Sequence, residues 1–91
     1  MERDERIQEA YQIIVKIDGM CHQGRFDEVN NLLRDMDVES MSEQALVTYL
    51  CVSRPAKDKL PYRQKFYEKA KAILIKRGRS SELPGLLNGL E

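Results

Sequence analysis

A chain of 91 residues is long enough for one domain, and a domain of this size buries only about 60–65% of its unfolded surface. Its two cysteines are too few for a disulfide scaffold and lack the spacing of a zinc site. Fifteen basic and fifteen acidic residues give zero net charge, which argues against a dedicated nucleic-acid-binding domain, since such domains are typically basic overall.

The zero net charge conceals an asymmetry along the chain. Residues 1–53 carry a net charge of −6, residues 54–79 carry +8, and the last twelve residues carry −2. We therefore expect a dipolar surface whose basic end attracts an acidic partner. No apolar stretch of signal-peptide length follows the charged N-terminus, and no run approaches the roughly 20 residues of a membrane span. The sequence predicts a cytoplasmic protein with reduced cysteines and no membrane contact.

The first helix is predicted over residues 2–22. Its acidic start suits the helix dipole, and its apolar residues recur at helical spacing. The expected buried face consists of Ile7, Ala10, Tyr11, Ile14, Ile17 and Cys21. Ile13 and Val15 widen this face, so we expect the helix to be covered on more than one side. Gly19 is interpreted as a point of close approach by the second helix, with a neutral sequence accident as the alternative.

A glycine turn joins the first helix to the second, which is predicted over residues 26–36. Gly24 is expected to end the first helix in the left-handed conformation. Asp27 is expected either to cap the second helix or to stabilise its start by charge. The apolar stripe of the second helix comprises Phe26, Val29, Leu32, Leu33 and Met36. The two helices are therefore predicted to form an antiparallel hairpin.

Residues 18–29 read Asp-Gly-Met-Cys-His-Gln-Gly-Arg-Phe-Asp-Glu-Val, with Met36 downstream. This stretch resembles the helical hairpin of a pentatricopeptide or tetratricopeptide-type repeat. The tyrosine usual in the first helix of that family aligns with Ile13, and the polar residue that contacts an RNA base aligns with Ile14. No second copy of the motif follows, whereas stacked repeats need about three units for a stable array. The resemblance implies a helical hairpin and does not imply RNA reading.

The third helix is predicted over residues 42–54, with two competing starts. One start uses Ser40 as the N-cap of a capping box, and the other uses Ser42 beside a hydrophobic staple. Pro55 is expected to end the helix, because the residue before a proline is pushed out of the helical conformation.

The fourth helix is predicted over residues 61–77 and is expected to close at Gly78. Lys65, Lys69 and Lys76 form a stripe along one flank of this helix. Its expected core face consists of Tyr62, Phe66, Ala70, Ile73 and Leu74, with Tyr67 at the edge.

A short C-terminal helix is predicted over residues 83–90. Its apolar face consists of Leu83, Leu86, Leu87 and Leu90. A helix this short is not stable by itself, so the leucines must pack on another surface. Their own domain and a second chain are both open as that surface.

Cys21 and His22 are the only neighbouring pair that suggests nucleophilic catalysis. Adjacent residues on a helix point about 100° apart, and no motif supplies a third, orienting group. One histidine and two separated cysteines do not make a metal site, and the glycines do not follow a phosphate-binding pattern. We therefore predict no catalytic, cofactor-binding or metal-binding residues, no small-molecule substrate and no enzymatic activity.

The predicted fold is all-α: a single domain over residues 1–91 with four helices, an N-terminal antiparallel hairpin and a short C-terminal helical turn. The predicted function is that of a small non-catalytic helical interaction or adaptor module, which binds a protein partner or a second copy of itself. The predicted partner-binding residues are Lys65, Lys69, Lys76, Leu83, Leu86, Leu87 and Leu90. The alternative is a nucleic-acid-binding accessory protein that uses the basic fourth helix. A third interpretation of the basic segment is a solvated face that compensates the acidic first half across a contact.

Overall fold

A computed structural model describes residues 2–91 of the chain and the side chains of residues 8–91. The described part is a single all-α domain, as the sequence predicts. Its α-helices are α1 (Glu2–His22), α2 (Phe26–Asp35), α3 (Glu43–Ser53), α4 (Arg63–Lys76) and α5 (Leu83–Leu86). Its short 3₁₀ helices are η1 (Val38–Ser40), η2 (Arg54–Lys59) and η3 (Ser80–Glu82).

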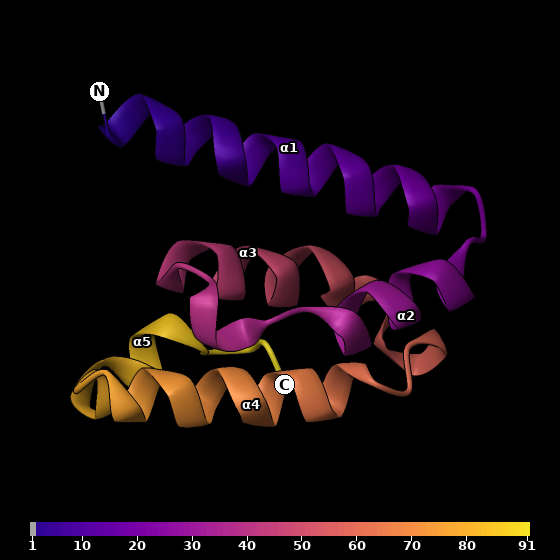
Figure 1. Cartoon of the computed structure of the whole chain (residues 1–91). Coiled ribbons are helices and arrows are strands. Elements are labelled where there is room, and N and C mark those ends of the chain that lie inside the picture. Colours follow the sequence, from indigo (N-terminus) through magenta and orange to yellow (C-terminus); the bar gives the residue numbers. More distant parts are fainter. Residues whose placement is uncertain (1) are drawn as a thin grey trace.

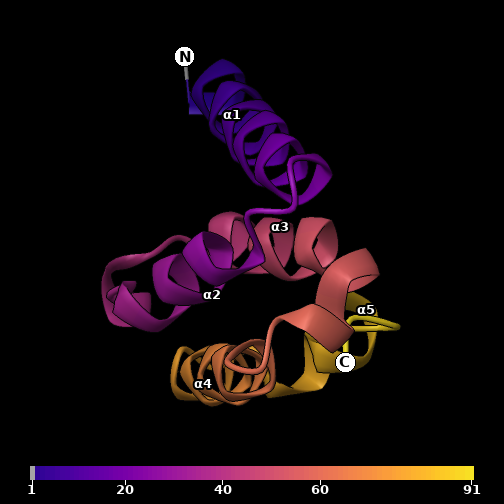
Figure 2. The same cartoon turned by 90° about the vertical axis from the view of Figure 1, so that its right-hand side faces the viewer.

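The helices are arranged in three layers (Figure 1). α1 covers one side of α3, α2 lies beside α3 in the middle layer, and α4 lies on the opposite side together with the C-terminal tail, as the end-on view also shows (Figure 2). The chain reverses after α1, but α1 packs mainly along α3 and only secondarily against α2. The predicted hairpin partner is therefore not the main packing partner of α1.

A left-handed glycine ends α1, as predicted. Gly24 has a φ of +73°, its N–H donates to the carbonyl of Cys21 at 3.1 Å, and the N–H of Arg25 donates to the carbonyl of Met20 at 2.9 Å. This pair of bonds is a Schellman motif, which satisfies carbonyls that the helix itself leaves without donors. Gly78, with a φ of +80°, closes α4 with the same pattern of bonds.

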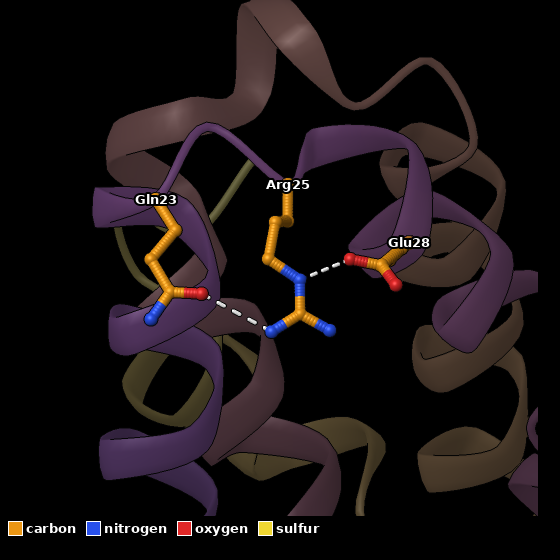
Figure 3. A network of polar contacts seen from close by, with 3 residues as sticks. All are labelled: Gln23, Arg25 and Glu28. Carbon is orange, nitrogen blue, oxygen red and sulfur yellow. Dashed lines mark hydrogen bonds and ion pairs between the residues drawn. The ribbon is translucent and has the colours of Figure 1, made fainter.

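Polar side chains support the turn between α1 and α2 (Figure 3). The guanidinium of Arg25 donates to Oε1 of Gln23 at 3.1 Å and forms an ion pair with Glu28. α2 begins after Arg25 without a side-chain cap. Of the two roles predicted for Asp27, the structure shows only negative charge in the first turn, where the helix dipole favours it.

The start of α3 resolves the two sequence-based alternatives. Oγ of Ser42 accepts a hydrogen bond from the N–H of Ala45 at 3.1 Å, so Ser42 is the N-cap. Ser40 lies in η1 instead and donates from Oγ to the carbonyl of Asp37 at 3.0 Å. At the other end, α3 stops at Ser53, close to the predicted end, but the predicted reason is wrong. Arg54, the residue before Pro55, keeps a helical conformation (φ −58°, ψ −43°), and Pro55 lies in the first turn of η2.

The hydrophobic core lies between the layers and draws on all of them. Its fully buried apolar side chains are Ile17, Val29, Leu33, Leu46, Leu50, Leu60, Phe66, Ala70 and Leu74. The rings of Tyr49 and Phe66 meet edge to face, with centroids 6.4 Å apart, where α3 contacts α4. The core face predicted for α4 is therefore largely confirmed, with Tyr62 half-buried at its margin.

The predicted buried face of α1 is wrong in its orientation. Ile13 and Ile17 are 7% and 0% exposed, whereas Tyr11 and Ile14 are 68% and 46% exposed. The side chain of Ile7 lies outside the described residues. At 100° per residue, the buried stripe is rotated by roughly 60° from the predicted one. Apolar residues occupy so much of this helix that spacing alone did not select which side faces the core.

The interpretation of Gly19 as a point of close approach by α2 is also wrong. A Cβ atom built at Gly19 meets no atom of the protein within 4 Å. The glycine therefore lies in a regular helix, with open space where its side chain would be.

The two glycines of the α1 region give a matched test of these geometries. Gly19→Ala should raise the free energy of unfolding by up to about 1 kcal/mol, because alanine favours the helix and has room for its methyl group. Gly24→Ala should lower it by about 1 kcal/mol or more, because an L side chain is strained at a φ of +73°. Urea denaturation measures both; equal effects of the two variants would contradict the assigned conformations.

Candidate functional site

The predicted lysine stripe lies on the solvent side of α4. Lys65, Lys69 and Lys76 are all exposed. Nζ of Lys69 donates to the hydroxyl of Tyr62 at 2.6 Å and lies 5.3 Å from the centroid of its ring. Among the described side chains, Lys65 and Lys76 form no ion pair. The stripe is therefore available to a partner, but the Tyr62 ring is already in contact with Lys69.

The C-terminal end of the basic segment contacts the acidic half of the chain. Nη2 of Arg77 donates to the carbonyl of Glu39 at 2.9 Å, and Arg79 pairs with Glu43 at 3.2 Å and also with Glu82. These contacts fit the interpretation that part of the basic charge compensates the first half of the chain across a contact. Exposed pairs of this kind contribute little to stability, about 0–1 kcal/mol each.

The leucines of the C-terminal tail pack on their own domain. Leu87 and Leu90 are buried, and Leu83 and Leu86 are half-buried against the same core. The predicted helix over residues 83–90 is too long, because α5 ends at Leu86 and the chain then turns through Gly89, whose φ is +74°. In this arrangement the four leucines belong to the core and do not form an exposed surface for a partner.

One basic residue of the segment is not on the surface. Arg63, the first residue of α4, is only 2% exposed. Its Nε donates to Oγ of Ser53 at 2.9 Å, and its Nη2 donates to the carbonyls of Leu50 and Leu90 at 2.7 and 2.6 Å. Burial, aided by the positive charge of Arg54, lowers the pKa of Arg63. In the sequence, Arg63 is one of ten basic residues between residues 54 and 79, and no local pattern distinguishes it as buried.

Arg63 donates to backbone carbonyls at the end of α3 and in the tail. The carbonyl of Leu50 is in the last turn of α3, where intrahelical donors end and the helix dipole favours positive charge. The carbonyl of Leu90 belongs to the tail. The hydroxyl of Ser53 accepts from Arg63 and donates its own hydrogen bond to the carbonyl of Tyr49 at 2.6 Å. The guanidinium thus joins α3, α4 and the tail, which is a structural role.

The structure places both Cys21 and His22 close to Asp18 of the preceding turn of α1. Nδ1 of His22 lies 2.8 Å from the carbonyl of Asp18 and 3.5 Å from its carboxylate, so the ring is held against the preceding turn of α1. Partial burial and the negative charge of Asp18 raise the pKa of the Cys21 thiol. A raised pKa keeps the thiol protonated, which is unfavourable for a nucleophile.

Three large apolar side chains are exposed together on α1. Tyr11, Ile14 and Val15 are 68%, 46% and 53% exposed, and we call them the apolar strip. Residues three and four apart are neighbours on a helix, so the three side chains form one continuous patch. The strip points away from α3, because the stripe of Ile13 and Ile17 is on the other side of the helix. The sequence analysis noted these residues but assigned them to the core.

A groove of about 520 Å³ separates the first half of α1 from η1 and the start of α3. Ile13, Met36 and Met41 contribute apolar lining, and the exposed Glu9 lies at its edge. Burial, together with the negative charge of Glu9, raises the pKa of Tyr49, which also lines the groove. Within the described residues, no group of three His, Cys, Asp or Glu side chains could hold a metal ion.

Comparisons with known proteins add no further assignment. No family model, no curated protein and no solved structure matches this chain. Among the described helices, none combines the length and the apolar character needed to cross a membrane.

Replacing the buried arginine should weaken the whole domain. Arg63→Ala should lower the free energy of unfolding by at least about 2 kcal/mol, because three buried oxygens, two in α3 and one in the tail, lose a charged donor. Arg54→Ala is the matched control, since Arg54 is exposed and a surface change of this kind stays within about 0.5 kcal/mol. Urea denaturation measures both, and proteolysis in the tail after residue 82 should accelerate only in Arg63→Ala. Equal stability of the two variants would contradict the structural role.

Proposed function

We propose that the chain is a small non-catalytic helical module that binds another protein chain through α1. The observation that carries this proposal is the apolar strip of Tyr11, Ile14 and Val15. Single exposed apolar residues are normal on protein surfaces, whereas contiguous ones are typical of interaction sites. Complete burial of a large apolar side chain contributes about 1.5–3 kcal/mol, so covering this patch is a substantial source of binding energy.

The strip has no role in closing the core of the domain. α1 is anchored on α3 through Ile13 and Ile17, both of which are buried without help from the strip. A helix with an apolar stripe on two sides is expected to be covered on both. α3 covers the side with Ile13 and Ile17, and in this proposal the partner covers the side with the apolar strip.

Two features of the neighbouring polar residues support a non-catalytic role. The thiol of Cys21 has a raised pKa, which disfavours the thiolate that nucleophilic attack requires. The buried Arg63 is used by the fold itself, through its bonds to the carbonyls of Leu50 and Leu90.

The proposal is tested by site-specific photo-crosslinking in cells. A photo-crosslinking amino acid at position 15 should give discrete protein adducts, and the additional change Tyr11→Glu should remove them, because a charge would have to be buried in the contact. The matched control is the same amino acid at position 64, an exposed glutamine on α4. Equal adducts from both positions, or no adduct from position 15, would refute binding through α1.

The lysine stripe supports a second candidate, a nucleic-acid-binding accessory function. Lys65 and Lys76 are exposed without acidic partners among the described side chains, and Lys69 is exposed above Tyr62. We rank this function second, because Glu68 lines the same surface depression and Tyr62, the aromatic residue nearest the stripe, is held by Lys69.

Salt dependence separates the two candidates. A nucleic-acid site should show a logarithmic salt slope of about −0.9 per phosphate contacted on duplex DNA, and Lys65→Gln, Lys69→Gln and Lys76→Gln together should flatten it by about three contacts. The control triple variant, Lys16→Gln, Lys57→Gln and Lys71→Gln, makes the same charge change elsewhere on the exposed surface. We expect weak binding at about 0.15 M salt and no difference between the variants. Sub-micromolar, salt-sensitive binding that only the stripe variant loses would establish the second candidate instead.

A further inference from the structure

We infer that the partner of the apolar strip is a second copy of this chain, in a symmetric dimer in which the two α1 helices pack antiparallel. This inference rests on the proposed function and names its partner. A two-fold contact uses the same patch on both copies, so the patch must be complementary to itself. The outer side of α1 meets that condition through three features: the apolar strip, the carboxylate of Asp18 and the small residue Gly19.

The charges on the outer side of α1 select the antiparallel orientation. Among the described side chains, the exposed polar residues beside the strip, Gln8 and Gln12, are uncharged, and the carboxylate of Asp18 follows the strip on its C-terminal side. A parallel pair would bring the two Asp18 carboxylates together, which is unfavourable. An antiparallel pair separates them by the length of the strip and also opposes the two helix dipoles favourably.

The antiparallel register follows from centring the contact between Ile14 and Val15. Each Ile14 then lies opposite Val15 of the second copy, and each Tyr11 lies opposite Asp18 of the second copy. The phenol of Tyr11 is a donor and the carboxylate of Asp18 an acceptor, so the pair can form a charge-assisted hydrogen bond twice in the dimer. The register therefore joins apolar residues at the centre and polar pairs at both ends.

Gly19 provides a notch where the register needs one. It follows Val15 by one turn, and a Cβ atom built there meets nothing within 4 Å. In the antiparallel register this position lies beside Tyr11 of the second copy, whose large ring needs space close to the backbone. No contact within the described part of the chain requires a glycine at this position of the helix. In the dimer, the absence of a side chain at Gly19 makes room for the ring of Tyr11 of the second copy.

The size of the contact predicts a weak dimer. α1 has 21 residues, which corresponds to a length of about 31 Å at 1.5 Å per residue. One helix face per copy falls short of the roughly 1,200–2,000 Å² that stable protein interfaces bury. We therefore expect association in the micromolar range or weaker, with rapid exchange between monomer and dimer.

Sedimentation equilibrium from low-micromolar to millimolar concentrations tests the dimer. Ile14→Glu and Gly19→Leu should each weaken association at least tenfold, the first by placing a charge in the contact and the second by filling the notch. Gly19→Leu should leave thermal stability equal or higher, since leucine favours a helix more than glycine does, so its effect cannot come from unfolding. Gln64→Glu and Ala72→Leu place the same side chains on the exposed face of α4 and should leave association unchanged.

Disulfide trapping tests the orientation, in a background with Cys21→Ala and Cys51→Ser. A mixture of chains carrying Tyr11→Cys and Asp18→Cys should form the mixed disulfide, and neither chain alone should form a dimer efficiently. Efficient trapping of Tyr11→Cys with itself would overturn the antiparallel register.

A chain that stays monomeric at all concentrations, or a dimer whose association is unchanged by both Ile14→Glu and Gly19→Leu, would overturn the proposed dimer. Crosslinking from position 15 to a different protein would then still support binding through α1, so the two proposals fail separately.

Discussion

The buried guanidinium of Arg63 is the interaction on which the arrangement of the last third of the chain depends. Removing an arginine from water is costly, and here no carboxylate compensates it among the described residues; three oxygens and the C-terminal end of α3 do so instead. Because one of these oxygens is the carbonyl of Leu90, the charge can be satisfied only with the tail in place. The buried cation thus ties the docking of the tail to the junction of α3 and α4.

Docking of the tail determines which apolar surface stays uncovered. Because Leu87 and Leu90 are buried in the core, the tail of the chain itself covers the apolar surface beside α4. α1 forms the opposite layer alone (Figure 1), although Asp18 and His22 at its C-terminal end line a groove together with residues of η2. The apolar strip is therefore a consequence of the topology: a three-layer arrangement with a single helix in one outer layer exposes the far side of that helix.

Features decided by local chemistry could be predicted from the sequence, whereas features decided by distant contacts could not. Gly24 and Gly78 act through bonds within five residues, and both were predicted correctly; Ser42, whose bond spans three residues, was one of two predicted N-caps. Arg63 depends on acceptors 10, 13 and 27 residues away, so its neighbours in the sequence gave no sign of burial. The orientation of α1 failed for a related reason, since its apolar residues fit two faces and only the position of α3 decides between them.

The two exposed surfaces of the chain are compatible with each other. α1 and α4 lie on opposite sides of α3 (Figures 1 and 2), so the apolar strip and the lysine stripe face away from one another. At about 0.15 M salt, charges separated by more than about 8 Å are largely screened. Positive charge on α4 therefore does not oppose association through α1, and pairing of two α1 helices would direct both lysine stripes outward. A contact through α4 would instead bring two basic faces together. Self-association through α1 therefore involves less charge repulsion than self-association through α4.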